Sequence, residues 1–240
     1  MRRRLIPQGA AVVLFALLAG CATYRDGDGE TGTRFDPKYL FKTDVDRVVD
    51  TSHAQILEGL MRIADKLYRR NPREWKKAGF SDRDAAIARL RVFRTQPPDG
   101  LAGHLEGQAA LRAFAPGYGG DRVGALLYGL LTMVDAAYEH RDESFILDSL
   151  DAQKFYNCAR NMEVALWKLA SSHDAERKPV LLTNEISDAG RNLSFEREFG
   201  RIVGLLDLMS SVLEDKHGRL VTRAAQSLAT SFFLPVGGLH

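Results

Sequence analysis

The sequence has few of the features from which a function is usually inferred. It holds two cysteines, Cys21 and Cys158, in 240 residues, so at most one disulfide can form. After residue 20, no apolar run approaches the roughly 20 residues that a membrane-spanning helix needs. No window alternates apolar and polar residues over the length of a strand. These absences argue against a disulfide framework, a spanning domain and a β-sheet core.

Short catalytic motifs are also missing. The serines have no G-x-S-x-G context, and Gly117, Gly119 and Gly120 have neither a preceding strand nor the lysine of a phosphate loop. None of the histidines has the H-E-x-x-H spacing of a zinc site. They are His53, His104, His140, His173, His217 and His240. No local motif therefore supports a serine hydrolase, a nucleotide-binding protein or a metalloprotease, and we expect no cofactor and no metal.

The first twenty residues have the pattern of a signal peptide. Three arginines, Arg2, Arg3 and Arg4, precede an unbroken apolar run over residues 10–19, which ends in small residues before Cys21. The stretch Leu18-Ala19-Gly20-Cys21 resembles the lipobox of bacterial lipoproteins. The alternative is an ordinary cleaved signal with a cysteine at this position by chance.

The resemblance implies a lipid anchor. In that family the cysteine thiol receives a diacylglyceryl group, cleavage falls on its amino side, and the freed amine can then be acylated as well. Each buried methylene contributes about 0.8 kcal/mol, and two or more chains hold a protein stably at a bilayer. Ala22 is not the aspartate that retains many lipoproteins at the inner membrane. The resemblance therefore implies attachment through Cys21 to the outer membrane, facing the periplasm.

Three regions are expected along the chain. Residues 1–20 form the signal peptide, residues 21–34 the lipidated cysteine and a flexible tether, and residues 35–240 a helical domain. The tether is expected because residues 22–33 are rich in glycine and acidic side chains and lack apolar periodicity. Loss of the leader leaves 30 basic and 31 acidic residues, a net charge of −1. A chain so balanced gives no reason to expect a nucleic-acid partner.

Apolar residues recur at intervals of three and four through most of the remaining chain, which predicts helices. The first such stripe runs from Val49 to Leu67, and Ser81 with Asp84 has the spacing of a capping box. Ser194 is a candidate cap for the last long helix. We predict an all-α domain, a bundle or irregular array of about five longer and two shorter helices. Their expected ranges are 43–71, 81–93, 105–114, 123–138, 152–169, 195–217 and 221–232.

Two apolar segments, 57–65 and 127–135, are similar in sequence, and residues 204–210 resemble them more faintly. Each contains a glycine that would allow close helix packing. Either they are equivalent helices of a repeated array, or apolar helices are alike by composition alone.

Two groups of residues are candidates for a site. Asp135, Glu139, His140, Asp142 and Glu143 gather acids and a histidine at the end of the predicted helix 123–138. Of these, Glu139, His140 and Glu143 have the chemistry that acid–base catalysis needs, although a solvated helix end has the same composition. A basic group follows the first helix, and its partners would be anionic. Its members are Lys66, Arg69, Arg70, Arg73, Lys76 and Lys77.

Two further residues have a structural interpretation. His53 falls on the apolar stripe of the first helix, which favours a neutral histidine in or near the core over a ligand. Cys158 lies beside an apolar stripe, and free cysteines are among the most buried residues, so we expect an inert thiol.

The leading hypothesis is a non-enzymatic helical lipoprotein of the cell envelope that presents a binding surface to a partner protein. One alternative is a hydrolase of envelope glycan or lipid with its site in the region 139–143. Another is a carrier that holds a hydrophobic ligand between its helices, which an enclosed apolar void would distinguish from a packed bundle.

Overall fold

The computed structural model describes residues 23–25, 31–33, 44–101, 103–141, 150–187, 190–217 and 232–237. The chain divides into two units, residues 1–42 and residues 43–240. Cys21 and the expected signal peptide lie outside the described residues.

The first unit contains a short antiparallel ribbon. Strand β1 (Thr23–Arg25) pairs with strand β2 (Thr31–Thr33), with Thr23 opposite Thr33. The sequence led us to expect no regular structure here, and this pairing is therefore a difference from the predicted tether. Residues 22–33 are rich in glycine and do not alternate apolar and polar side chains, so periodicity could not predict these strands.

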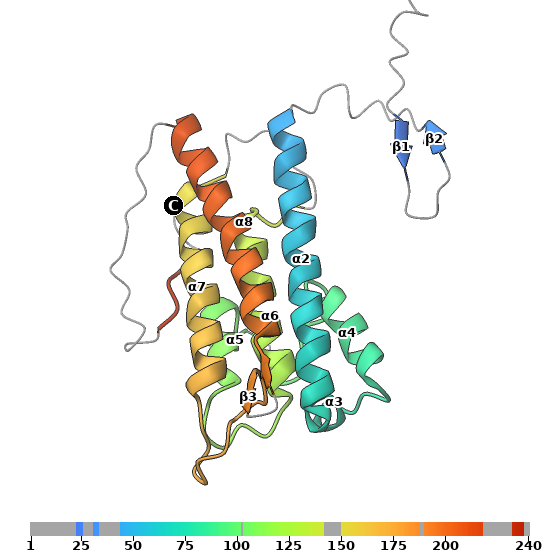
Figure 1. The fold of residues 1–240 in the computed structure, drawn as a ribbon, viewed down its shortest axis with the longest axis vertical. Coiled ribbons are helices and arrows are strands. Elements are labelled where there is room, and N and C mark those ends of the chain that lie inside the picture. The colour runs from blue at the N-terminus through green and yellow to red at the C-terminus, as the bar shows by residue number, and fades with distance from the viewer. Residues whose placement is uncertain are drawn as a thin grey trace, which may run out of the picture. The chain divides into compact units, whose positions relative to one another are not determined.

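The second unit is built from packed α-helices, which confirms the all-α prediction (Figure 1). A second three-residue ribbon, β3 (Glu185–Ser187) with β4 (Gly190–Asn192), precedes the last helix. Among the described residues the unit has seven helices. They are α2 (Asp44–Arg70), α3 (Pro72–Lys77), α4 (Arg83–Arg91), α5 (Glu106–Arg112), α6 (Arg122–Ala137), α7 (Ala152–Ser171) and α8 (Ser194–His217).

Helix α6 is the centre of the array. It contacts α2, α3, α4, α5 and α7, while α8 packs against α7 and α2 (Figure 1). All fifteen residues from Val123 to Ala137 are buried, as expected of a helix that is apolar on every side. The stripe predicted for α2 is also buried, with Val49 and Leu67 at 0% exposure. No helix among the described residues is long and apolar enough to cross a bilayer.

Two predicted helix caps are wrong. The side chain of Asp82, not Ser81, caps α4 by accepting the N–H of Ala85 at 2.7 Å, and Ser81 instead donates its hydroxyl to Asp82. Ser194 is the first residue of α8 and does not cap it. Its N–H donates to Asn192 Oδ1 at 3.2 Å, so the acceptor comes from outside the helix.

Most helix ends differ from the predicted ones by one or two residues, and two regions differ more. The first helix ends at Arg70, but Pro72 starts the six-residue helix α3, which the sequence did not predict. Proline fits the first turn of a helix because its missing N–H would have no partner there. The predicted helix 221–232 lies outside the described residues except for Phe232, which belongs to an irregular segment, 232–237.

The three glycines of the similar apolar segments have different surroundings. A Cβ at Gly129 would lie 2.5 Å from backbone atoms of Glu106 and Ala110, so α5 and α6 approach closely there. A Cβ at Gly59 would meet only the side chain of Ile202, at 3.0 Å, and one at Gly204 would meet nothing within 4 Å. The glycines therefore have no common packing role.

Candidate functional site

The end of α6 brings together part of the predicted acid–histidine group. Asp135 is 6% exposed and accepts hydrogen bonds from Arg94 Nε and from His140 Nδ1, both at 2.6 Å. Carboxylate contact at Nδ1 orients an imidazole and leaves its other nitrogen for proton transfer. The chemistry that this arrangement offers is therefore that of an oriented histidine, whose side chain is 70% exposed.

The backbone at this helix end has an unusual conformation. Glu139 and His140 have φ values of +54° and +59°, a region that few residues other than glycine adopt. The turn directs the two side chains to different partners, because Glu139 pairs with Lys154 at 2.8 Å while His140 turns to Asp135. Glu143 and Asp142 lie outside the described residues. Glu139 and His140 thus do not converge on one point. No group of three or more acids, histidines or cysteines in the described part of the chain could hold a metal ion.

His53 and Cys158 both lie in the core. His53 is 5% exposed and stacks on Tyr138, with ring centroids 4.0 Å apart and planes at 15°. Cys158 is 0% exposed, and burial raises the pKa of its thiol. The positions of both residues fit the structural interpretation.

The six predicted basic residues have different surroundings. Lys66 turns toward α8, where Nζ donates to the Ser194 carbonyl at 3.2 Å and lies 6.0 Å from the centre of the Phe195 ring. Lys77 pairs with the buried carboxylate of Glu74 at 2.6 Å. The remaining four lie at the end of α2 and on α3, and Trp75 between them is half-buried against the core.

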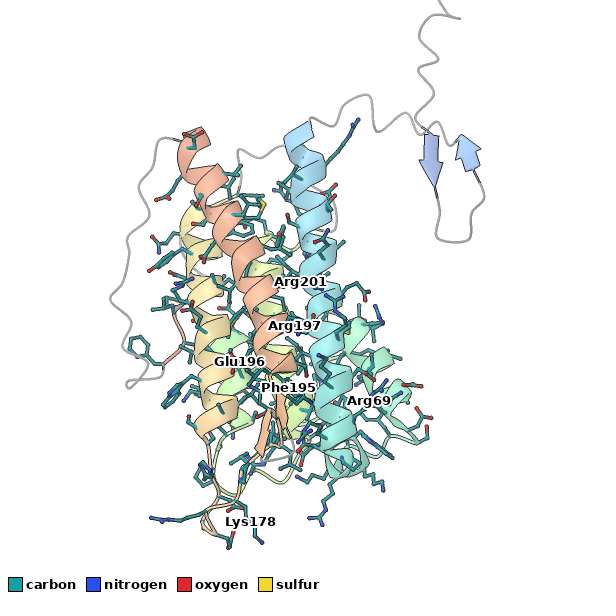
Figure 2. All side chains as sticks on the ribbon, viewed as in Figure 1. Arg69, Lys178, Phe195, Glu196, Arg197 and Arg201 are labelled. Atoms are coloured by element: carbon teal, nitrogen blue, oxygen red, sulfur yellow. The ribbon has the colours of Figure 1, made fainter. Side chains whose placement is uncertain are left out.

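Exposed cations nevertheless gather at this end of the molecule. The loop 172–184 joins it through Asn71, whose side chain accepts the N–H of Leu182 at 2.8 Å and donates to the Leu182 carbonyl at 2.9 Å. Figure 2 shows Arg69 and Lys178 toward the same end of the helices. We call this surface the basic end. It consists of the exposed residues Arg69, Arg73, Lys76, Lys77, Arg177 and Lys178, with the half-buried Arg70 beside them.

The carboxylates of the same stretch are already engaged. Asp65 pairs with Arg69 at 2.9 Å and with Arg83 at 3.0 Å. Glu74 is occupied by Lys77 and by the N–H of Arg122. The loop adds two exposed acids, Asp174 and Glu176. Seven cations, counting Arg70, against the four acids Asp65, Glu74, Asp174 and Glu176 leave the basic end with a net positive charge.

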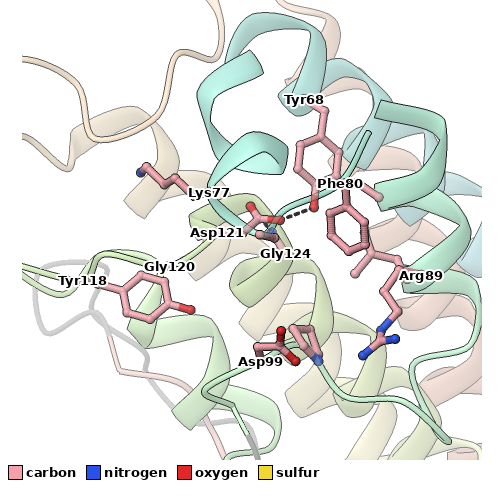
Figure 3. A pocket seen from close by; sticks show the side chains of 13 residues that line it. Tyr68, Lys77, Phe80, Arg89, Asp99, Tyr118, Gly120, Asp121 and Gly124 are labelled. Atoms are coloured by element: carbon pink, nitrogen blue, oxygen red, sulfur yellow. Dashed lines mark hydrogen bonds between the residues drawn. The ribbon is translucent and has the colours of Figure 1, made fainter. Parts of the chain in front are cut away.

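The structure also has a pocket that the sequence did not indicate (Figure 3). Its volume is about 210 Å³, and residues of α2, α3, α4 and the start of α6 line it. Tyr68 and Asp121 meet at its wall, where Tyr68 Oη donates to Asp121 Oδ2 at 2.6 Å. Lys77 and Asp99, both exposed, also line it, so the pocket opens at the surface.

Burial controls the titration of this pair. It raises the pKa of Asp121, and the neighbouring charge of Glu74 acts in the same direction, although the N–H of Gly124 and the Tyr68 hydroxyl oppose the rise. Burial and the Asp121 carboxylate raise the pKa of Tyr68. Asp121 is also the N-cap of α6, since Oδ1 accepts the Gly124 N–H at 2.8 Å. The hydrogen bond between Tyr68 and Asp121 thus links the start of α6 to α2. An aspartate just before an apolar helix was the only sequence signal for it.

Protein-family models, curated proteins and solved structures were compared with this chain, and none of them matches it. Its function has to be inferred from its own residues.

Proposed function

We propose that the chain is an outer-membrane lipoprotein, anchored through Cys21 and facing the periplasm, that serves as a non-enzymatic interaction module of the cell envelope. It binds an acidic face of a partner protein through the basic end. One observation carries the proposal. Arg73 and Lys76 are exposed and have no carboxylate partner among the described residues, while the nearby acids Asp65 and Glu74 pair with other cations, namely Arg69, Arg83 and Lys77. The lipobox resemblance at residues 18–21 supports the anchor.

The length of α2 separates the basic end from the start of the helical domain. The segment from Cys21 joins the domain at Asp44, and the basic end follows Arg70. A helix of 27 residues is about 40 Å long, at 1.5 Å per residue. The positive surface therefore lies at the end of α2 opposite the point where the chain enters the domain.

Electrostatics of this kind acts mainly on association. Exposed charges steer an oppositely charged partner and raise the association rate more than they raise affinity. Their field is screened within about 8–10 Å at physiological ionic strength. The proposal therefore predicts binding that weakens with added salt.

A photo-reactive residue at Lys76 tests the partner surface in intact envelopes. The control carries the same residue at Val48, which is also exposed but lies near the other end of α2. We expect capture of one acidic protein from Lys76 and not from Val48, with capture lost when Arg73 and Arg69 are both changed to glutamate. Equal capture from both positions contradicts a role for the basic end.

Metabolic labelling with palmitate tests the anchor. The chain should take up label, and a Cys21→Ser variant should not, because the thiol is the acceptor in the lipoproteins that residues 18–21 resemble. Label retained by Cys21→Ser would show that the anchor assignment is wrong.

A hydrolase acting on envelope glycan or lipid is the second candidate, and the oriented Asp135–His140 pair is the observation that favours it. Its predicted site includes Glu139 and Glu143. Hydrolysis of envelope substrates by the purified chain, abolished by His140→Ala with Glu139→Gln and Glu143→Gln, would support it. Activity that survives these three changes together excludes it.

A hydrophobic-ligand carrier gains no support from the pocket at Tyr68 and Asp121. That pocket is lined by charged side chains as well as apolar ones and opens at the surface.

A further inference from the structure

The segment 232–237 is held on the helical array by side chains that bind its backbone. Figure 1 shows it beside α7. Asn161 Nδ2 donates to the Leu234 carbonyl at 2.8 Å, and Asn161 Oδ1 accepts the Leu234 N–H at 2.6 Å. One amide side chain thus satisfies both polar groups of one residue, as a neighbouring strand would.

Two more side chains continue the pattern along the segment. Asn157, one turn before Asn161 on α7, donates to the Pro235 carbonyl at 2.7 Å. The carboxylate of Glu106 accepts two successive N–H groups, those of Val236 at 3.2 Å and Gly237 at 3.0 Å. Backbone N–H groups in sequence are a favourable site for an anion. Proline, which has no N–H, stands between the residues whose N–H groups are bound.

Two of the three residues that bind the segment are also held by other parts of the array. Asn161 is 0% exposed and Asn157 6%, and Gln153 Nε2 donates to Asn157 Oδ1 at 2.8 Å, which orients that amide. Glu106 has a φ of +49°, and its N–H donates to Thr132 Oγ1 at 2.8 Å. Strained residues that their surroundings hold in place are a feature of binding sites.

Glycines bring the two backbones together. A Cβ at Gly107 of α5 would lie 2.6 Å from Cβ of Phe233, and a Cβ at Gly237 would collide with the Glu106 carboxylate. The site thus accepts a small residue and then glycine after the proline, and it tolerates no side chain at Gly107.

The segment meets the array through two apolar side chains as well as through its backbone. Val236 is fully buried in the core and Phe233 packs against it, while Phe232 is 54% exposed and Pro235 is exposed as well. The residues that bind its backbone come from α5 and α7, between 73 and 131 positions away in sequence. Hydrogen bonds to backbone, together with apolar side chains at alternate positions, are a mode of recognition that any extended peptide of the same pattern can use.

We propose that α5 and α7 form a binding site for an extended apolar peptide of the pattern leucine, proline, small apolar residue, glycine. The chain's own residues 232–237 occupy this site, and a partner protein presenting such a segment displaces them. The site is separate from the basic end and does not depend on it. An attached segment competes at an effective concentration of the order of millimolar, which sets how strongly a partner must bind.

The test uses the full chain and a fluorescent peptide, Ser-Phe-Phe-Leu-Pro-Val-Gly-Gly, the sequence of residues 231–238. We expect the variant Gly237→Ala to loosen the attached segment, because the added Cβ meets the Glu106 carboxylate that binds it, and the variant leaves the sequences of α5 and α7 unchanged. We expect it to bind the peptide at least about tenfold more tightly than the unchanged chain, because the competitor is removed. Gly204→Ala is the matched control, since it lies in open space, and it should bind as the unchanged chain does.

Two further binding measurements test whether the peptide occupies the site between α5 and α7. The same peptide with alanine at the Gly237 position should bind at least about tenfold more weakly. Adding Asn161→Asp to the Gly237→Ala chain removes the donor to the Leu234 carbonyl and should weaken binding about tenfold.

Three outcomes overturn the proposal. The first is a Gly237→Ala chain with unchanged helicity that binds no better than the unchanged chain, and the second is equal binding of the alanine peptide. The third is a dimeric unchanged chain together with a monomeric Gly237→Ala variant. That result would mean that residues 232–237 of a second copy fill the site.

If Gly237→Ala does not fold, the unchanged chain is tested directly. The peptide, carrying a photo-reactive group in place of its second phenylalanine and supplied at millimolar concentration, should cross-link beside Gly107 on α5. Cross-links elsewhere only would overturn the proposal.

Discussion

The close approach of α5 and α6 at Gly129 makes a sharp prediction about stability. An alanine there would place Cβ 2.5 Å from the Ala110 nitrogen and 2.5 Å from the Glu106 oxygen. Atoms in contact normally lie about 3.5–4.0 Å apart, so the overlap is about 1 Å. Both neighbours are backbone atoms, so α5 itself has to move.

The size of the effect follows from two opposing contributions. Overpacking of this kind costs about 1–3 kcal/mol. Alanine also favours a helix over glycine by about 1 kcal/mol, which offsets part of the cost. Gly204→Ala receives the helical contribution alone, because a Cβ there meets nothing within 4 Å. The difference in unfolding free energy between Gly129→Ala and Gly204→Ala therefore isolates the steric cost, and we expect it to be about 2–3 kcal/mol.

Urea denaturation followed by circular dichroism measures the difference. Gly59→Ala should fall between the two, because only the side chain of Ile202 has to move. For a domain of this size each kcal/mol shifts Tm by about 2–4 °C, so heat denaturation should give the same order. If Gly129→Ala is as stable as Gly204→Ala, the close contact of α5 with α6 does not exist.

Three other predictions follow from single side chains. The raised pKa of Asp121 means that the native state holds this proton more tightly than the unfolded state, so the unfolding free energy should fall as pH rises from 3.8 through the raised pKa. The Asp121→Asn variant cannot ionise at this position, so urea denaturation should show a smaller dependence of its unfolding free energy on pH over this range. Asn71→Ala removes the bonds to Leu182 and should cost about 1–3 kcal/mol, with faster proteolysis of the loop 172–184; unchanged cleavage would contradict the role of Asn71. Cys158 should resist thiol reagents in the native chain and react on unfolding, since it is buried and its thiol pKa is raised; labelling of Cys158 itself in the native chain would refute this.

Much of the helical fold could be predicted from periodicity. The helix predicted over residues 43–71 matches α2 within one residue at each end, and the apolar run from Val123 marked α6 as the buried centre. Periodicity is informative because a helix must bury one face, and the residues of that face recur every three or four positions along the sequence. It failed for the helix α3, which is too short to show a period.

The candidate sites could be predicted only in part. The sequence placed Asp135 and His140 in one group, because they are five residues apart at one helix end. It could not predict that Arg94 joins them, that Glu139 pairs with Lys154, or that Lys66 leaves the basic group for α8. Those contacts depend on which helix faces which.

By itself the sequence determined the helical class, the approximate positions of the long helices and the lipobox resemblance at residues 18–21. These are local properties, carried by residues a few positions apart. Only the tertiary structure decided that Asn161 binds Leu234, that Tyr68 binds Asp121 and that Gly129 lies against α5. Each of these contacts joins segments from about 20 to more than 70 residues apart. Helical periodicity says which face is buried, but it carries no information on the partner that covers it.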